Sequence, residues 1–91
     1  MTARVLVVDD LEPNVKLLEA KLRAEYFDVV SALSGEEAIE KATAEKPDII
    51  LLDVMMPGLD GFETCRRIKS APETAHIPIV MVTALDQQAD R

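Results

Sequence analysis

The chain has 91 residues, of which 48% are hydrophobic and 30% are charged, and its formal net charge is −7. This composition is typical of one small soluble globular domain, has no low-complexity segment or repeat, and argues against disorder. The acidic charge disfavours direct binding of nucleic acid, and no apolar run approaches the roughly 18–20 residues that span a bilayer.

The first predicted elements are a buried strand and an amphipathic helix. Residues Arg4–Asp9 form an apolar, β-branched run that ends in acid, which is typical of a parallel strand buried on both faces. A helix is expected from about Pro13 to Glu25, because proline is tolerated in a first helical turn. The apolar residues that recur at helical spacing here are Leu11, Val15, Leu18 and Leu22.

A second strand and a second helix follow. We expect the strand over Phe27–Leu33, with Ser34 as the N-cap of the helix and two glutamates favourably placed in its first turn. Pro47 closes this helix. Its expected inward residues are Ala38, Ile39 and Ala42.

The third strand, Asp48–Asp53, repeats the form of the first, and a stiff turn segment, Met55–Gly61, comes after it. The third helix is expected to point Phe62, Cys65 and Ile68 inward and to break near Pro72. A fourth strand, Ile79–Thr83, opens after a proline, and the last eight residues resemble the first turn of an incomplete helix.

Alternation of strands and helices at this spacing predicts βαβ crossovers and a parallel sheet. In such sheets ligands bind beyond the carboxyl ends of the strands. Asp9, Asp53 and Thr83 are the polar residues at those ends.

The expected convergence of Asp9, Asp10 and Asp53 points to a metal site. Like charges this close must hold a proton or bind a cation, and oxygen ligands favour Mg²⁺. With such an ion present, the Asp53 carboxylate could attack phosphorus to give an acyl phosphate. The Thr83 hydroxyl is then a candidate switch, because it could hydrogen-bond the new dianion.

Three segments of the chain resemble response-regulator receiver domains. These segments are Leu6–Asp10, Asp48–Gly61 and Pro78–Ala84. The stretch from Asn14 to Tyr26 is further similar to the first receiver of PleD-type regulators, which join receivers to a diguanylate cyclase domain.

The resemblance implies a doubly wound, flavodoxin-like α/β fold with strand order 2-1-3-4. The family pattern continues with a fifth strand, which ends in a lysine, and a fifth helix, and neither is present in these 91 residues. We therefore expect a single receiver domain over residues 1–91, incomplete at its C-terminus.

The resemblance also implies roles for individual residues. Asp53 accepts a phosphoryl group from a histidine kinase or a histidine phosphotransfer protein, and Asp10 with Asp9 holds Mg²⁺. The backbone carbonyl of Met55 completes the metal shell, and Thr83, followed by Ala84, senses the phosphate. The side chains of Glu12 and Asn14 are expected at the rim of the site, where they tune the lifetime of the phosphoryl group.

Without the fifth strand and helix, the edge of the fourth strand and part of one sheet face are expected to be uncovered. We expect homo-oligomers through this edge, this face or a swapped element, and slow phosphorylation unless a partner supplies the missing cation. The alternative hypothesis is a truncated, receiver-like interaction fragment that dimerises and is not efficiently phosphorylated.

A phosphatase or phosphotransferase with an aspartyl-phosphate intermediate would carry a second carboxylate where Met55 stands, so we expect a regulatory domain and not an enzyme. Asp60 is expected to serve the turn and His76 to lie on the surface. Cys65 cannot form an internal disulfide because it is the sole cysteine, and we expect it to fill the core. A single free cysteine suits a reducing compartment, and we expect the protein to be cytoplasmic.

Overall fold

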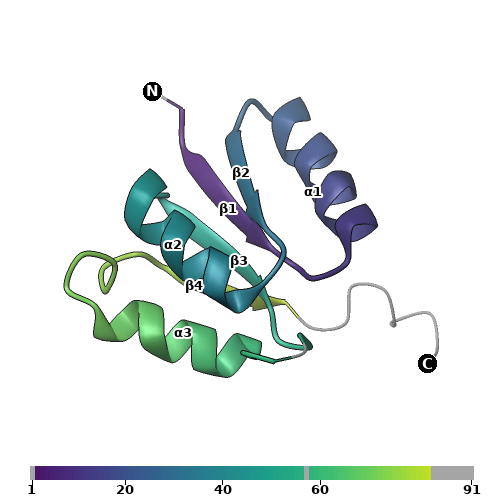
Figure 1. Cartoon of the computed structure of the whole chain (residues 1–91). Coiled ribbons are helices and arrows are strands. Elements are labelled where there is room, and N and C mark those ends of the chain that lie inside the picture. Colours follow the sequence, from purple (N-terminus) through teal and green to yellow (C-terminus); the bar gives the residue numbers. More distant parts are fainter. Residues whose placement is uncertain (1, 57, 83–91) are drawn as a thin grey trace.

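The computed structural model describes residues 2–56 and 58–82. Strands and helices alternate along this part of the chain (Figure 1). In chain order they are β1 (Arg4–Val8), α1 (Glu12–Ala24), β2 (Asp28–Ala32), α2 (Gly35–Glu45), β3 (Ile49–Asp53), α3 (Gly61–Ser70) and β4 (Ile79–Val82).

The four strands form one parallel sheet in the order β2-β1-β3-β4. The register pairs Val8 of β1 with Leu52 of β3, so these two central strands end at nearly the same level. Strand β4 lies on the other side of β3 and pairs Val82 with Asp53. The predicted α/β fold and strand order are confirmed.

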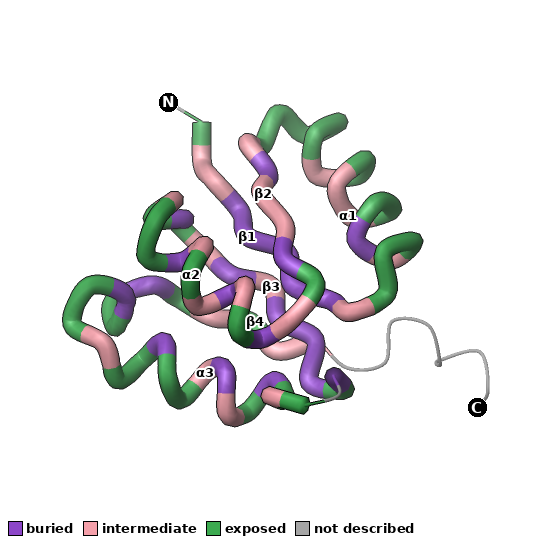
Figure 2. Tube along the Cα trace, in the orientation of Figure 1, coloured by how far each residue is buried: buried purple, intermediate pink, exposed green. Residues whose placement is uncertain are grey.

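The sheet is covered on one face by α2 and α3 and on the other by α1 (Figure 1). The larger core lies on the α2–α3 face, where Leu6, Ile50 and Leu52 are fully buried. The smaller core joins β1 and β2 to Val15 of α1. Burial follows the central strands, whereas the outer sides of the helices are exposed (Figure 2).

Local signals in the sequence account for the ends of α2. The Ser34 hydroxyl accepts a hydrogen bond from the Glu37 N–H at 3.1 Å, which confirms the expected N-cap. The helix ends at Glu45, and Lys46 takes a left-handed conformation with φ of 48° directly before Pro47.

The prediction that Phe62 points into the core is wrong, because this side chain is 69% exposed. Ile68 is buried as predicted, and the inward side of α3 carries Gly61 and Thr64 with it. A Cβ atom on Gly61 would lie 2.5 Å from the Asp53 carbonyl oxygen and 2.6 Å from Val54 Cα. The first turn of α3 therefore lies too close to β3 for a large side chain. Cys65 is partly buried and packs against the core, as expected.

The expected inward stripe of α1 is also wrong at its first member. Leu11 is the N-cap residue of α1 and is 41% exposed, whereas Val15 is buried and Leu18 and Leu22 are partly buried. Past the other end of α1, Tyr26 has a φ of 70° and is 87% exposed. None of the helices in the described part of the chain is long and apolar enough to cross a membrane.

Arg4 links several segments at the amino-terminal ends of the strands. Its guanidinium donates to Asp28 at 2.8 Å and to the Glu45 carbonyl oxygen at 2.9 Å, and its backbone N–H donates to Asp48 at 2.7 Å. The hydrogen bond to Asp28 raises the pKa of Arg4 above its ordinary value. These contacts lie at the end of the strands opposite the acidic residues that follow β1 and end β3.

Candidate functional site

Three carboxylates meet at the carboxyl ends of the two central strands. Asp9 and Asp10 directly follow β1, and Asp53 is the last residue of β3. One carboxylate oxygen from each of the three lies within 4.8 Å of the others. The parallel pairing of β1 with β3 produces this convergence, because it brings the two strand ends side by side.

Two of the three carboxylates are buried and held by nearby donors. Asp9 is 1% exposed, and its Oδ1 accepts a hydrogen bond from the Leu11 N–H at 2.9 Å. Its Oδ2 accepts from the side-chain amide of Asn14 at 3.2 Å. Asp53 is 6% exposed, and its Oδ1 accepts from the Met55 N–H at 3.0 Å. Backbone turns therefore orient both Asp9 and Asp53 before any ligand binds.

The donor set of this site fits a hard divalent cation. Three carboxylates this close repel one another, and burial of two of them weakens the screening by water. A bound Mg²⁺ would neutralise the repulsion, since it prefers oxygen ligands and is usually held by one or two carboxylates with several waters. Asp10, which is less buried than the other two, lies where it can contact both the ion and solvent.

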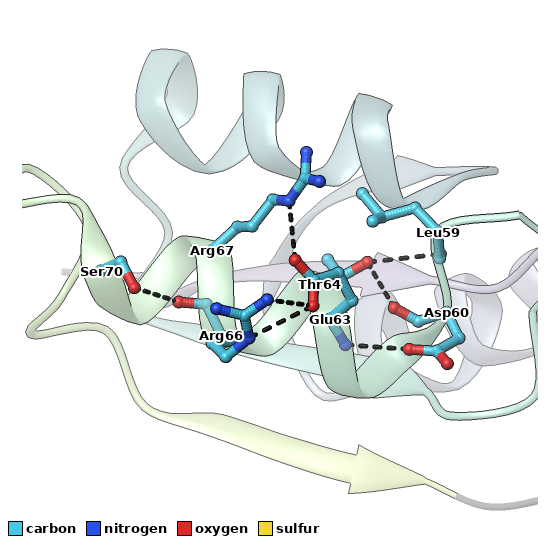
Figure 3. A network of polar contacts seen from close by, with 7 residues as sticks. All are labelled: Leu59, Asp60, Glu63, Thr64, Arg66, Arg67 and Ser70. Carbon is cyan, nitrogen blue, oxygen red and sulfur yellow. Dashed lines mark hydrogen bonds and ion pairs between the residues drawn. The ribbon is translucent and has the colours of Figure 1, made fainter.

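The turn after Asp53 is fixed to the start of α3 by polar contacts (Figure 3). Asp60 caps this helix, because its Oδ1 accepts a hydrogen bond from the Glu63 N–H at 2.9 Å. The Thr64 hydroxyl donates to the Asp60 carbonyl oxygen at 2.7 Å. The expectation that Asp60 serves the turn is confirmed.

The other residues that the sequence singles out have different outcomes. Met55 is 61% exposed, and its N–H contacts Asp53, whereas the role expected of its carbonyl stays a prediction. Thr83 and Ala84 lie outside the described residues. The Glu12 side chain is exposed and pairs with Lys16 at 3.7 Å.

Asn14 is closer to the site than its expected place at the rim implies, since its amide contacts Asp9 directly. One feature of the sequence could have predicted this contact. Asn14 comes five residues after Asp9 and lies in the first turn of a helix that starts beside the end of β1. Helical periodicity alone gave no reason to turn this side chain back toward Asp9.

Comparisons with known proteins agree on one family. The sequence profile of the response regulator receiver domain matches residues 5–91. The chain is 60% identical over 91 residues to the response regulator PleD of Caulobacter vibrioides, and it is 46% identical to the alkaline phosphatase synthesis transcriptional regulatory protein PhoP of Bacillus subtilis. All of this chain is aligned in both comparisons, but it spans only 20% of PleD and 37% of PhoP.

Solved structures show the same fold. The N-terminal domain of a response regulator receiver protein from Methanoculleus marisnigri superposes with a TM-score of 0.90 at 39% identity, over 99% of this chain and 76% of that one. The receiver domain of a sensor histidine kinase from Pseudomonas aeruginosa superposes with a TM-score of 0.86 at 32% identity, over 100% of this chain and 75% of that one. A magnesium ion is coordinated in the active-site cleft of the Pseudomonas protein.

Proposed function

The chain belongs to the response regulator receiver domain family, and from this premise we propose that Asp53 accepts a phosphoryl group from a phosphohistidine. Receiver domains are the regulatory phosphoacceptor domains of two-component systems. The donor in this proposal is a histidine kinase or a histidine phosphotransfer protein. The observation that carries the assignment is the convergence of Asp9, Asp10 and Asp53 at the carboxyl ends of β1 and β3.

The proposed chemistry is a single in-line phosphoryl transfer. A carboxylate oxygen of Asp53 attacks the phosphorus atom, the bond between phosphorus and the imidazole nitrogen of the donor breaks, and the imidazole keeps the electron pair. The product is an acyl phosphate on Asp53. The hydrogen bond from the Met55 N–H supports this role, because it orients the carboxylate before the donor arrives.

Mg²⁺ would be held by Asp10, Asp9, Asp53 and the backbone carbonyl of Met55. When bound, the ion neutralises negative charge on the phosphoryl oxygens during transfer. The buried carboxylates supply the negative potential that attracts it.

The proposed phosphate sensor is the Thr83 hydroxyl, with Ala84 beside it in the sequence. Support comes from the register of β4, which pairs its last residue, Val82, with Asp53, and Thr83 directly follows Val82 in the sequence. A hydrogen bond from this hydroxyl to the phosphoryl group would exist only in the phosphorylated state.

The test uses beryllofluoride, a non-covalent mimic of the phosphoryl group, with the full chain and NMR detection. We expect Mg²⁺-dependent shifts centred on Asp53 and Thr83. Asp53→Asn removes the acceptor carboxylate, so it should abolish these shifts. Asp60→Asn is the matched control, because it makes the same chemical change at a helix cap, where asparagine serves as well as aspartate. Equal binding of the mimic by Asp53→Asn and the parent would overturn the assignment.

A second part of the proposal concerns self-association through β4. This strand lies at one edge of the described sheet, and its Val80 is 45% exposed. An apolar, β-branched edge can pair with the same edge of another chain. The alternative hypothesis is that the chain is only an interaction fragment. In that case its association should not change when Mg²⁺ or a phosphodonor is added.

A further inference from the structure

Both oxygens of the Asp9 carboxylate are engaged by the turn that links β1 to α1. Oδ1 accepts from the Leu11 N–H at 2.9 Å, and Oδ2 accepts from Asn14 Nδ2 at 3.2 Å. Asn14 is itself fixed at the start of α1, since its backbone N–H donates to the Leu11 carbonyl oxygen at 3.0 Å. The amide thus reaches Asp9 from a rigid first helical turn.

Two donors on two different oxygens set the plane of a carboxylate, because rotation of the group about its Cβ–Cγ bond would break both hydrogen bonds. The Leu11 donor belongs to the backbone, so Asn14 supplies the side-chain half of this constraint. Each carboxylate oxygen has two lone pairs, and one pair on each therefore stays available to a cation or to its water. The hydrogen bond from Asn14 can persist when an ion is bound, so it orients Asp9 without competing for the ion.

We propose that Asn14 is a positioning residue of the metal site, which holds Asp9 in the orientation that binds Mg²⁺. The proposal rests on the function proposed above. The Asn14 amide provides a donor without adding a fourth negative charge to the three carboxylates. The number of negative charges affects whether the site prefers Mg²⁺ or Ca²⁺. Mg²⁺ keeps several waters and binds few carboxylates, whereas Ca²⁺ takes six to eight oxygen ligands and gains affinity from added charge.

The first experiment compares the Mg²⁺ affinity of the full chain with that of two variants. The amide NMR signals of Asp10 and Met55 report the binding during a Mg²⁺ titration. Asn14→Ala and the similarly sized Asn14→Leu both remove the donor, and we expect the Mg²⁺ Kd to rise about 10-fold or more, as for other residues that orient metal ligands. Because the signals come from folded molecules, a loss of stability alone leaves this Kd unchanged. The leucine variant serves if the alanine variant does not fold.

The matched control is Thr43→Ala. Thr43 is a neutral, exposed residue whose side chain makes one hydrogen bond, to the Ile39 carbonyl oxygen within α2. Loss of this hydrogen bond should perturb α2 about as much as loss of the Asn14 side chain perturbs α1, but it leaves Asp9 untouched. The Mg²⁺ Kd should therefore stay within about twofold of the parent value.

The second experiment measures ion selectivity in Asn14→Asp, which keeps the shape of the side chain but replaces the donor by a charge. The ratio of Ca²⁺ affinity to Mg²⁺ affinity should rise, a change that a purely structural role for Asn14 would not cause. The inference is overturned if the parent binds Mg²⁺ and Asn14→Ala or Asn14→Leu binds it equally well, or if the ion ratio does not move. A parent chain that binds no Mg²⁺ would instead refute the proposed function itself.

Discussion

Gly35 lies where the start of α2 meets the turn that follows Asp53. A Cβ atom at this position would collide with the Thr64 hydroxyl and would lie 2.7 Å from the Leu59 carbonyl oxygen. The same hydroxyl donates to the Asp60 carbonyl oxygen (Figure 3). The absence of a side chain at Gly35 therefore lets α2 and α3 approach each other without displacing the turn beside the acidic site.

Gly35→Ala should lower the free energy of unfolding by about 1–3 kcal/mol, the usual cost of forcing extra atoms into a well-packed contact. Helix propensity alone predicts the opposite, since alanine is favoured over glycine by about 1 kcal/mol inside a helix. Denaturant unfolding of the parent and the variant measures the difference.

A double-mutant cycle identifies the cause. In the background of Thr64→Ala, one of the two colliding atoms is gone, so Gly35→Ala should cost less than it does in the parent. A Gly35→Ala variant as stable as the parent would contradict the collision.

At the scale of the elements, the surface of α3 carries a compact group of charges. The Glu63 carboxylate accepts hydrogen bonds from both Arg66 and Arg67, the latter at 3.0 Å (Figure 3). The hydrogen bond from Arg66, followed by that from Arg67, lowers the pKa of Glu63 below its ordinary value. The group is partly exposed, so solvent screens the effect.

The lowered pKa of Glu63 gives a pH dependence of definite sign. Its contribution to stability is fully present above the ordinary glutamate pKa of about 4.3, and it is lost as the pH falls through the lower folded-state value. An NMR titration of the Glu63 carboxyl should find its midpoint below that of the same group in a chain with Arg66→Ala and Arg67→Ala. Equal midpoints in the two chains would contradict the pairing.

Helix α3 also marks the limit of what periodicity can predict. Strands β1 and β3, whose apolar runs end in acid, were predictable because burial on both faces leaves a continuous apolar signature. The inward face of α3 is built from Gly61 and Thr64 as well as Ile68, and neither glycine nor threonine registers as apolar. Hydrophobicity therefore predicts Phe62 to point inward, although the helix turns Gly61, Thr64 and Ile68 toward the core and leaves Phe62 exposed.

For the acidic site, the sequence predicted which carboxylates would meet but not what orients them. The strand-end rule brought Asp9 and Asp53 together from β1 and β3 without any knowledge of side-chain geometry. The amide of Asn14 depends on a rotamer and on the angle at which α1 leaves the sheet, and neither follows from residue spacing. The roles of Thr83 and Ala84 stay predictions.

At the scale of the whole molecule, the proposed association through β4 predicts a mass near twice the 10.0 kDa of one chain. Light scattering at micromolar concentration measures this mass. Val80→Lys places a charge on the exposed edge and should shift the population to monomers, because charged side chains oppose edge pairing.

Leu17→Lys is the matched control for the edge. Leu17 is 58% exposed on α1, away from β4, and the same substitution there should leave the mass unchanged. A folded monomer of the parent chain at this concentration would contradict the association.

The exposed position of Tyr26 determines which optical methods can follow this protein. The chain has no tryptophan and one tyrosine, and that tyrosine is 87% exposed just beyond α1. Its ring meets nearly the same aqueous surroundings in the folded and unfolded chain, so intrinsic fluorescence would change little on unfolding. Circular dichroism of the backbone, or amide NMR signals, would report unfolding, which changes the emission of this tyrosine very little.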